Sequence, residues 1–124
     1  NFGYTREEDE DVFGIDIYVQ FYCKESWWNP RIKMDDVLEH EQLHFDICEL
    51  YGRKFFKAVL ELKKDGKFNA KSIEISYTRM EKEFDEYQNL YDGETDHSTN
   101  GEMQRKWNDY VHSELNRLND YAGY

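Results

Sequence analysis

The stretch that dominates this sequence is residues 35–64, DDVLEHEQLHFDICELYGRKFFKAVLELKK, which predicts one long amphipathic helix. At about 100° per residue, its core-facing line carries Val37, Glu41, His44, Cys48, Tyr51 and Phe55. Two aspartates at the start and two lysines at the end suit the helix dipole, and Asp65-Gly66 supplies a stop. We therefore expect a helix with two histidines on or beside its buried face.

An alternating pattern before this helix predicts one β-strand. In residues 13–21 apolar side chains alternate with polar or small ones, at Phe13, Ile15, Ile17, Val19 and Phe21. The preceding acidic run, Glu7 to Asp11, is expected to form a solvated turn.

Two further helices follow the long one. Residues 71–91 place apolar and aromatic side chains on one stripe, at Ile73, Tyr77, Met80, Phe84, Tyr87 and Tyr91. We expect Asp92-Gly93 to end this helix and residues 92–101 to form a polar loop. A third helix, from about Glu102, has Met103, Trp107, Val111, Leu115 and Leu118 at helical spacing. The predicted fold is α+β, a small sheet against about three helices, in a single domain spanning residues 1–124.

Composition excludes several classes of partner. The 124 residues hold 16 Lys and Arg against 27 Asp and Glu, and the net charge of -11 repels nucleic acid. No stretch approaches the roughly 20 apolar residues of a membrane-spanning segment. Cys23 and Cys48 could form one disulfide, but the place of Cys48 on the helix stripe favours two buried thiols.

The long helix carries an HExxH motif, His40-Glu41-Gln42-Leu43-His44. His40 and His44 lie one turn apart, so that both imidazoles can reach one zinc ion. Glu41 is rotated by about 100° from His40 and suits the role of a general base. In this chemistry the metal lowers the pKa of a water, Glu41 accepts its proton, and the hydroxide attacks a polarised carbonyl. The alternative is a helix surface with two unrelated histidines, but unpartnered groups on a buried stripe would be destabilising.

A catalytic zinc normally has three protein ligands, so a third is expected outside the motif. His97, in the loop after the second predicted helix, is the first choice. Carboxylates also serve as third ligands, which leaves Asp92, Glu94 and Asp96 as alternatives. His112 is a weaker candidate because it stands among charged residues beside the core stripe of the third helix.

Supporting roles are also open at this stage. Asp46 or Asp92 could accept a hydrogen bond from the far nitrogen of a metal-bound histidine. Tyr91, close to the proposed ligand loop, could stabilise an oxyanion.

Two motifs together resemble a known family. His40-Glu41-Gln42-Leu43-His44-Phe45-Asp46-Ile47, followed by Tyr91-Asp92-Gly93-Glu94-Thr95-Asp96-His97, is similar to the bacterial family called domain of unknown function 922, regarded as predicted secreted zinc proteases. Ser26-Trp27 matches a Ser-Trp usual there, and the resemblance spans roughly residues 13–107. Leu43 and Ser98 depart from the pattern, since each replaces a glycine.

The resemblance implies a zincin-like fold, with an edge strand beside the metal helix and the active-site cleft between them. It implies that His97 is the third zinc ligand beside His40 and His44. Together with a chain that starts at Asn1 without a start methionine, it leads us to expect an extracytoplasmic location, secreted or periplasmic.

These features predict a zinc-dependent peptidase with a peptide or protein substrate, which would pair with the edge strand at residues 13–21. Two other functions stay open. One is a catalytically inactive zinc-binding or interaction module. The other is a zinc hydrolase that acts on another amide, such as a cell-wall peptide.

Overall fold

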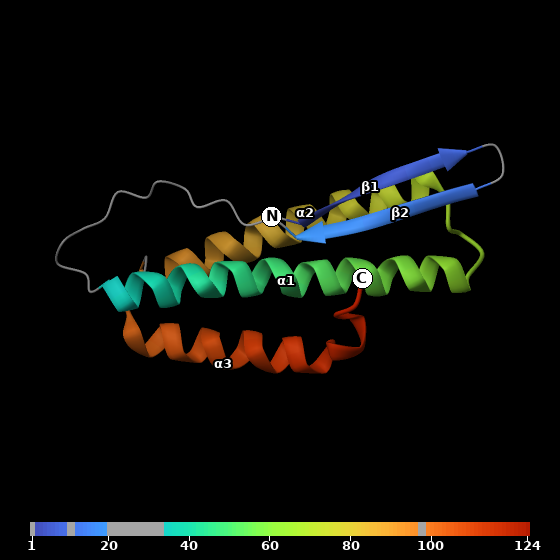
Figure 1. Ribbon diagram of the computed structural model, residues 1–124. Coiled ribbons are helices and arrows are strands. Elements are labelled where there is room, and N and C mark those ends of the chain that lie inside the picture. Colours follow the sequence, from blue (N-terminus) through green and yellow to red (C-terminus); the bar gives the residue numbers. More distant parts are fainter. Residues whose placement is uncertain (1, 10–11, 20–33, 97–98) are drawn as a thin grey trace.

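The computed structural model describes residues 2–9, 12–19, 34–96 and 99–124. In these residues the chain is α+β, with one antiparallel hairpin and three long helices (Figure 1). The elements in chain order are β1 (Phe2–Asp9), β2 (Val12–Val19), α1 (Met34–Lys64), α2 (Ala70–Glu94), α3 (Gly101–Arg117) and the short 3-10 helix η1 (Asn119–Tyr121).

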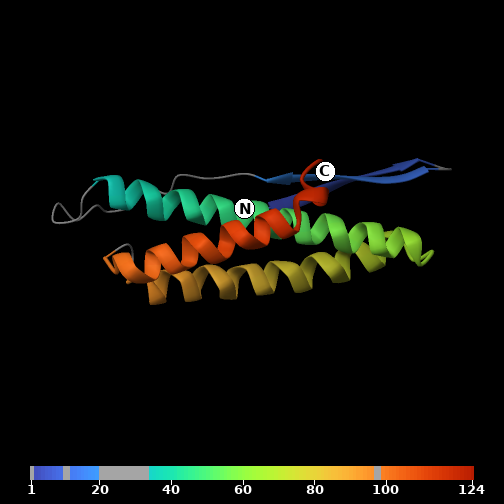
Figure 2. The ribbon, with the colours of Figure 1, turned by 90° about the horizontal axis from the view of Figure 1, so that it is seen from below.

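Helix α1 is the central element and contacts each of the others. The hairpin and α3 lie on opposite sides of α1, and α2 runs alongside it (Figures 1 and 2). The helix ends at Lys64, and Gly66 follows in the turn with a φ of 70°, which suits a residue without a side chain. Asparagine side chains begin the other two helices: Asn69 accepts from the Ser72 amide at 3.0 Å, and Asn100 accepts from the Met103 amide at 3.2 Å.

The hairpin is attached to the helices through aromatic side chains. Phe2 is 1% exposed, and its ring lies against Tyr51 and Phe55 of α1 and against Tyr77 and Phe84 of α2. Tyr51 lies two helical turns, about 10 Å along the axis, beyond His44. The described sheet therefore covers the C-terminal half of α1. Pairing of a substrate with the edge strand beside the metal helix stays a prediction.

The helices agree with the patterns in the sequence. The predicted bounds of α1 are confirmed within one residue, and Ile73, Phe84 and Tyr91 of the α2 stripe are buried. Three of the positions predicted for the third helix, Trp107, Val111 and Leu118, are buried as well, and Leu118 lies just after the end of α3. Helix α2 is longer than expected, because it continues through Asp92 and Gly93 to Glu94 and ends at the cap residue Thr95.

Other expectations about the first half of the chain were wrong. The acidic residues Glu7 to Asp9 are not a turn, because they belong to β1 and pair with Val12 to Gly14 of β2. The buried line of α1 also lies differently near the histidines. His40, Leu43 and Ile47 are buried, whereas Glu41 is only half-buried. Because α2 and α3 both pack against this part of α1, they cover a wider face than one stripe.

Two expectations of the sequence concern the core and the surface. Cys48 is buried in the core, as expected, and Cys23 lies outside the described residues. Among the residues that the structure describes, no helix combines the length and the apolar character that crossing a bilayer requires.

Candidate metal centre

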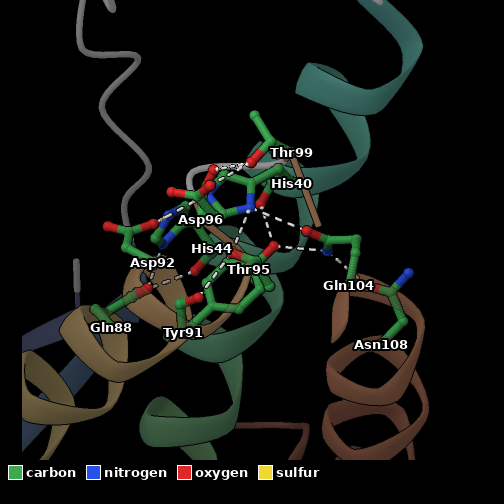
Figure 3. A network of polar contacts seen from close by, with 10 residues as sticks. All are labelled: His40, His44, Gln88, Tyr91, Asp92, Thr95, Asp96, Thr99, Gln104 and Asn108. Carbon is green, nitrogen blue, oxygen red and sulfur yellow. Dashed lines mark hydrogen bonds and ion pairs between the residues drawn. The ribbon is translucent and has the colours of Figure 1, made fainter. Parts of the chain in front are cut away.

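The HExxH histidines of α1 face the last turn of α2 (Figure 3). Their ring centroids are 4.8 Å apart, and the planes are nearly perpendicular. His40 is only 4% exposed and stacks on the ring of Tyr91 at 4.5 Å. Tyr91 itself is fully buried, and its ring packs against both histidine rings and so forms the floor of the site.

Asp92 lies between the two imidazoles. Its Oδ1 atom is 2.9 Å from Nε2 of His40 and 2.6 Å from Nε2 of His44. The three atoms lie within 4.8 Å of one another, and their types are those that bind a metal ion. An aspartate that follows Tyr91 in the last turn of α2 can reach both rings because the helix does not stop before it.

The other nitrogen of each ring faces a glutamine oxygen. Nδ1 of His40 is 3.0 Å from Oε1 of Gln104, and Nδ1 of His44 contacts Oε1 of Gln88. An amide oxygen only accepts, so each Nδ1 must carry a proton. The hydrogen bond at one ring nitrogen decides the role of the other. In the neutral ring, Nε2 therefore presents a lone pair.

This arrangement brings three electron-pair donors together. Two Nε2 lone pairs and a carboxylate oxygen repel one another unless a cation lies among them, either protons or a metal ion. Imidazole nitrogen and carboxylate oxygen are zinc ligands, and two histidines with one carboxylate form a known catalytic set. The donor set of His40, His44 and Asp92 therefore fits a zinc ion.

In the metal-free protein, the pKa shifts of Asp92 and His44 favour protons between the imidazoles and the carboxylate. Burial raises the pKa of Asp92, but hydrogen bonds from His40 and His44 outweigh burial and hold it well below its usual range. Burial lowers the pKa of His44, yet the bonds to Asp92 and Gln88 and the charges of Asp92 and Glu41 leave it raised. The Asp92 carboxylate thus favours a positive charge on the adjacent His44 ring or on an ion beside it.

The predicted base, Glu41, is not one of the three clustered ligands. It directly follows His40 on α1 and is half-buried. Burial raises the pKa of Tyr91, the hydrogen bond with Gln104 lowers it, and the charges of Asp92, Glu41 and Glu39 raise it further. The charge of Glu41 also helps to raise the pKa of His44, so Glu41 acts electrostatically on the histidine pair.

The candidates for the third metal ligand differ in whether they contact the two histidines. His97, the first choice, lies outside the described residues. Asp92 alone among the described alternatives reaches both histidines. Glu94 accepts from Trp107 Nε1 at 3.1 Å, and Asp96 accepts from the Thr99 hydroxyl at 2.8 Å.

The contacts of His112, Asp46 and Tyr91 bear on their predicted roles. Exposed His112 is 3.2 Å from Asp46, so the two bind each other. Asp46 is therefore not the acceptor for a ring nitrogen of His40 or His44 among the described contacts. Tyr91 donates its only hydroxyl proton to the backbone oxygen of His40 at 2.9 Å, which contradicts a role as an oxyanion donor.

Sequence reasoning missed Gln88, Gln104 and Thr95. Gln88 precedes Asp92 by one helical turn, and Gln104 stands on the buried side of α3 with Trp107 and Val111. A polar residue on an apolar stripe was the available signal for Gln104. Beside it, Asp36, Glu39, Glu102 and Arg105 line a hollow that reaches Gln104.

No known protein family, curated protein or solved structure that was compared with the chain matches it. The resemblance to the predicted zinc proteases therefore rests on the two sequence motifs and the Ser26-Trp27 pair alone.

Proposed function

We propose that the protein is a zinc-dependent hydrolase that cleaves peptide bonds. The observation that carries this proposal is the convergence of His40 Nε2, His44 Nε2 and Asp92 Oδ1, with both Nδ1 atoms committed to glutamine oxygens. His40, His44 and Asp92 would hold the ion. When bound, zinc lowers the pKa of water to near neutrality and polarises a carbonyl group.

The residues around the ion divide the remaining work. The Glu41 carboxylate accepts the proton of the attacking water and returns it to the departing amine. Tyr91 and the two glutamines hold the imidazoles in place. A peptide substrate is supported by the similarity of the HExxH and Tyr91 to His97 motifs to those of predicted zinc proteases, and the same similarity supports an extracytoplasmic location.

The number of protein ligands separates this function from a second candidate. Three protein ligands leave a fourth position open for water, whereas four close a zinc site and make it structural. Asp92 reaches the histidine pair. The motif resemblance implies that His97 is also a ligand. If both bind together with His40 and His44, the protein is a zinc-binding module without hydrolase activity.

Single substitutions distinguish these cases. If Asp92 is the third ligand, Asp92→Asn lowers the zinc affinity strongly and His97→Gln leaves it unchanged. If His97 is the third ligand, the order is reversed. A loss of affinity in both variants, with no peptidase activity in the wild type, would establish the closed site.

The role of Glu41 is tested in zinc-loaded protein with a library of quenched fluorescent peptides. We expect Glu41→Gln to bind zinc as tightly as the wild type and to lose about 10²- to 10⁴-fold in rate. Glu61→Gln, an exposed glutamate of the same helix, is the matched control and should keep full activity. Full peptidase activity in Glu41→Gln would refute the assigned base. Activity on a cell-wall peptide alone would redefine the substrate.

A further inference from the structure

We infer that Gln104 is a positioning residue, which holds a proton on Nδ1 of His40 and so leaves Nε2 free to bind the metal. This inference rests on the metal site of the proposed function and deepens it. Gln104 comes from α3, the helix that contributes no ligand to the cluster, and it is 4% exposed. The orientation of its amide therefore decides which nitrogen of the buried His40 ring carries the proton.

The orientation of the Gln104 amide is set in part by a chain of hydrogen bonds that starts at the exposed residue Glu39. Asn108 donates from Nδ2 to Oε1 of Glu39 at 2.5 Å, and a carboxylate can only accept. The other end of the Asn108 amide, Oδ1, consequently faces Nε2 of Gln104 at 3.0 Å. Because Asn108 presents an oxygen, Gln104 must present its NH₂ group to that side.

A second bond fixes the same orientation from the interior. Nε2 of Gln104 donates to the Tyr91 hydroxyl at 2.7 Å, and that hydroxyl donates its proton to the backbone oxygen of His40 at 2.9 Å. Both protons of the Gln104 NH₂ group are now used. Oε1 is left to face Nδ1 of His40 (Figure 3).

Thr95 supports the placement of the proton independently of Gln104. Its hydroxyl donates to the backbone oxygen of Tyr91 at 2.7 Å and lies 3.4 Å from Nδ1 of His40. Since the single hydroxyl proton points at a carbonyl, only lone pairs face the ring. Nδ1 of His40 thus meets two oxygen acceptors, and a bare Nδ1 would repel both.

His44 has a parallel arrangement. Gln88 contacts Nδ1 of His44 with Oε1, and its Nε2 donates to the backbone oxygen of the same histidine at 3.2 Å. At His40, Nε2 of Gln104 does not bond to the backbone oxygen of the histidine directly. It donates to the Tyr91 hydroxyl, which donates to that oxygen. In both cases an uncharged amide orients the ring. A neutral acceptor raises the basicity of the ligand less than a carboxylate would.

Two substitutions separate an acceptor role from a packing role. Both substitutions lose the NH₂ group that donates to the Tyr91 hydroxyl and to Asn108 Oδ1. Gln104→Leu keeps the approximate volume but also removes the acceptor for Nδ1, whereas Gln104→Glu keeps that acceptor and introduces charge. We expect Gln104→Leu to weaken zinc binding by about 10- to 100-fold and Gln104→Glu to stay within about threefold of the wild type. If Gln104 only filled the core, leucine would be tolerated better than glutamate. The reverse order of affinities would overturn the inference.

Competition with a chromophoric chelator measures these affinities in the full chain. Gln42→Leu is the matched control, because Gln42 is an exposed glutamine of α1 whose amide donates to Asp46. Its zinc affinity should equal that of the wild type. Circular dichroism of each metal-free variant shows whether the helices are intact.

Nitrogen-15 NMR of the imidazole rings tests the proton directly. In the wild type we expect a protonated Nδ1 of His40 both without metal and with zinc bound. A bare Nδ1 in the wild type would overturn the inference whether or not zinc binds, and whether or not Gln104→Leu folds. A protonated Nδ1 in a protein that takes up no zinc would support the role of Gln104 and refute the proposed function.

Discussion

Asp92→Asn should change the stability of the metal-free protein differently at acidic and at alkaline pH. Asp92 has a lowered pKa in the folded protein, so it contributes stability above about pH 3.9, which is lost as the pH falls through the folded value. His44 has a raised pKa, so it contributes stability below about pH 6.5, which is lost as the pH rises through the folded value. Both contributions are therefore present between about pH 4 and pH 6.5.

The size of the effect follows from the contacts. At pH 5.5 the Asp92 carboxylate accepts from His44 at 2.6 Å, and the same oxygen lies 2.9 Å from Nε2 of His40. Hydrogen bonds to charged groups contribute about 1.5–3 kcal/mol each. Because the Asp92 side chain is 30% exposed, solvent screens the pair, and we expect a total loss of about 2 kcal/mol. The melting temperature should fall by about 8 °C.

At pH 9 the sign should change. The neutral imidazole of His44 carries its proton on Nδ1, so the carboxylate of Asp92 faces a lone pair on Nε2 of His44, whereas the introduced amide can donate to that lone pair. The variant should then equal the wild type or exceed its stability by about 1 kcal/mol.

Urea unfolding followed by circular dichroism, with chelator present at both pH values, gives the two free energies. Asp85→Asn, an exposed aspartate of α2, is the control and should change little at either pH. An equal loss of stability in Asp92→Asn at pH 5.5 and pH 9 would refute the assignment of the protons.

Three further predictions concern the core, the floor of the site and the metal. Tyr91→Phe removes a buried hydroxyl that bonds to His40 and Gln104, and it should lower the free energy of unfolding by about 1–2 kcal/mol, measured in urea, as well as the zinc affinity. Phe2→Ala empties a site among four aromatic rings and should cost about 3–5 kcal/mol with no change in zinc affinity, because the sheet lies away from the histidines. Zinc at 100 times its dissociation constant should stabilise the wild type by about 2.7 kcal/mol, and chelator should reverse the shift in a thermal melt. A melt that zinc does not move would contradict specific binding to the folded state.

The helices were predictable because their signal is local. Each of the three presents apolar side chains at helical spacing, and a turn signal such as Asp65-Gly66 follows α1. Strand β1 was missed because its alternation consists of Phe2 and Tyr4 only, and the acidic residues after them resemble a solvated turn. Its pairing with β2 supplies what its own sequence lacks.

The candidate site was predictable only in its first half. HExxH places His40 and His44 one turn apart, since the spacing is a property of the helix itself. Asp92 remained one carboxylate among several because its position depends on how α2 packs on α1 and on where α2 ends. Gln88 and Gln104 come from different helices, and their amide orientations depend on bonds across the bundle. Such information exists only in the tertiary structure.

A crystal structure of the zinc-loaded protein, with anomalous diffraction at the zinc edge, tests the central claim most directly. It should place one ion at about 2.0–2.2 Å from Nε2 of His40, Nε2 of His44 and a carboxylate oxygen of Asp92, with a fourth position open. Zinc bound elsewhere, or bound to Nδ1 of either histidine, would contradict it.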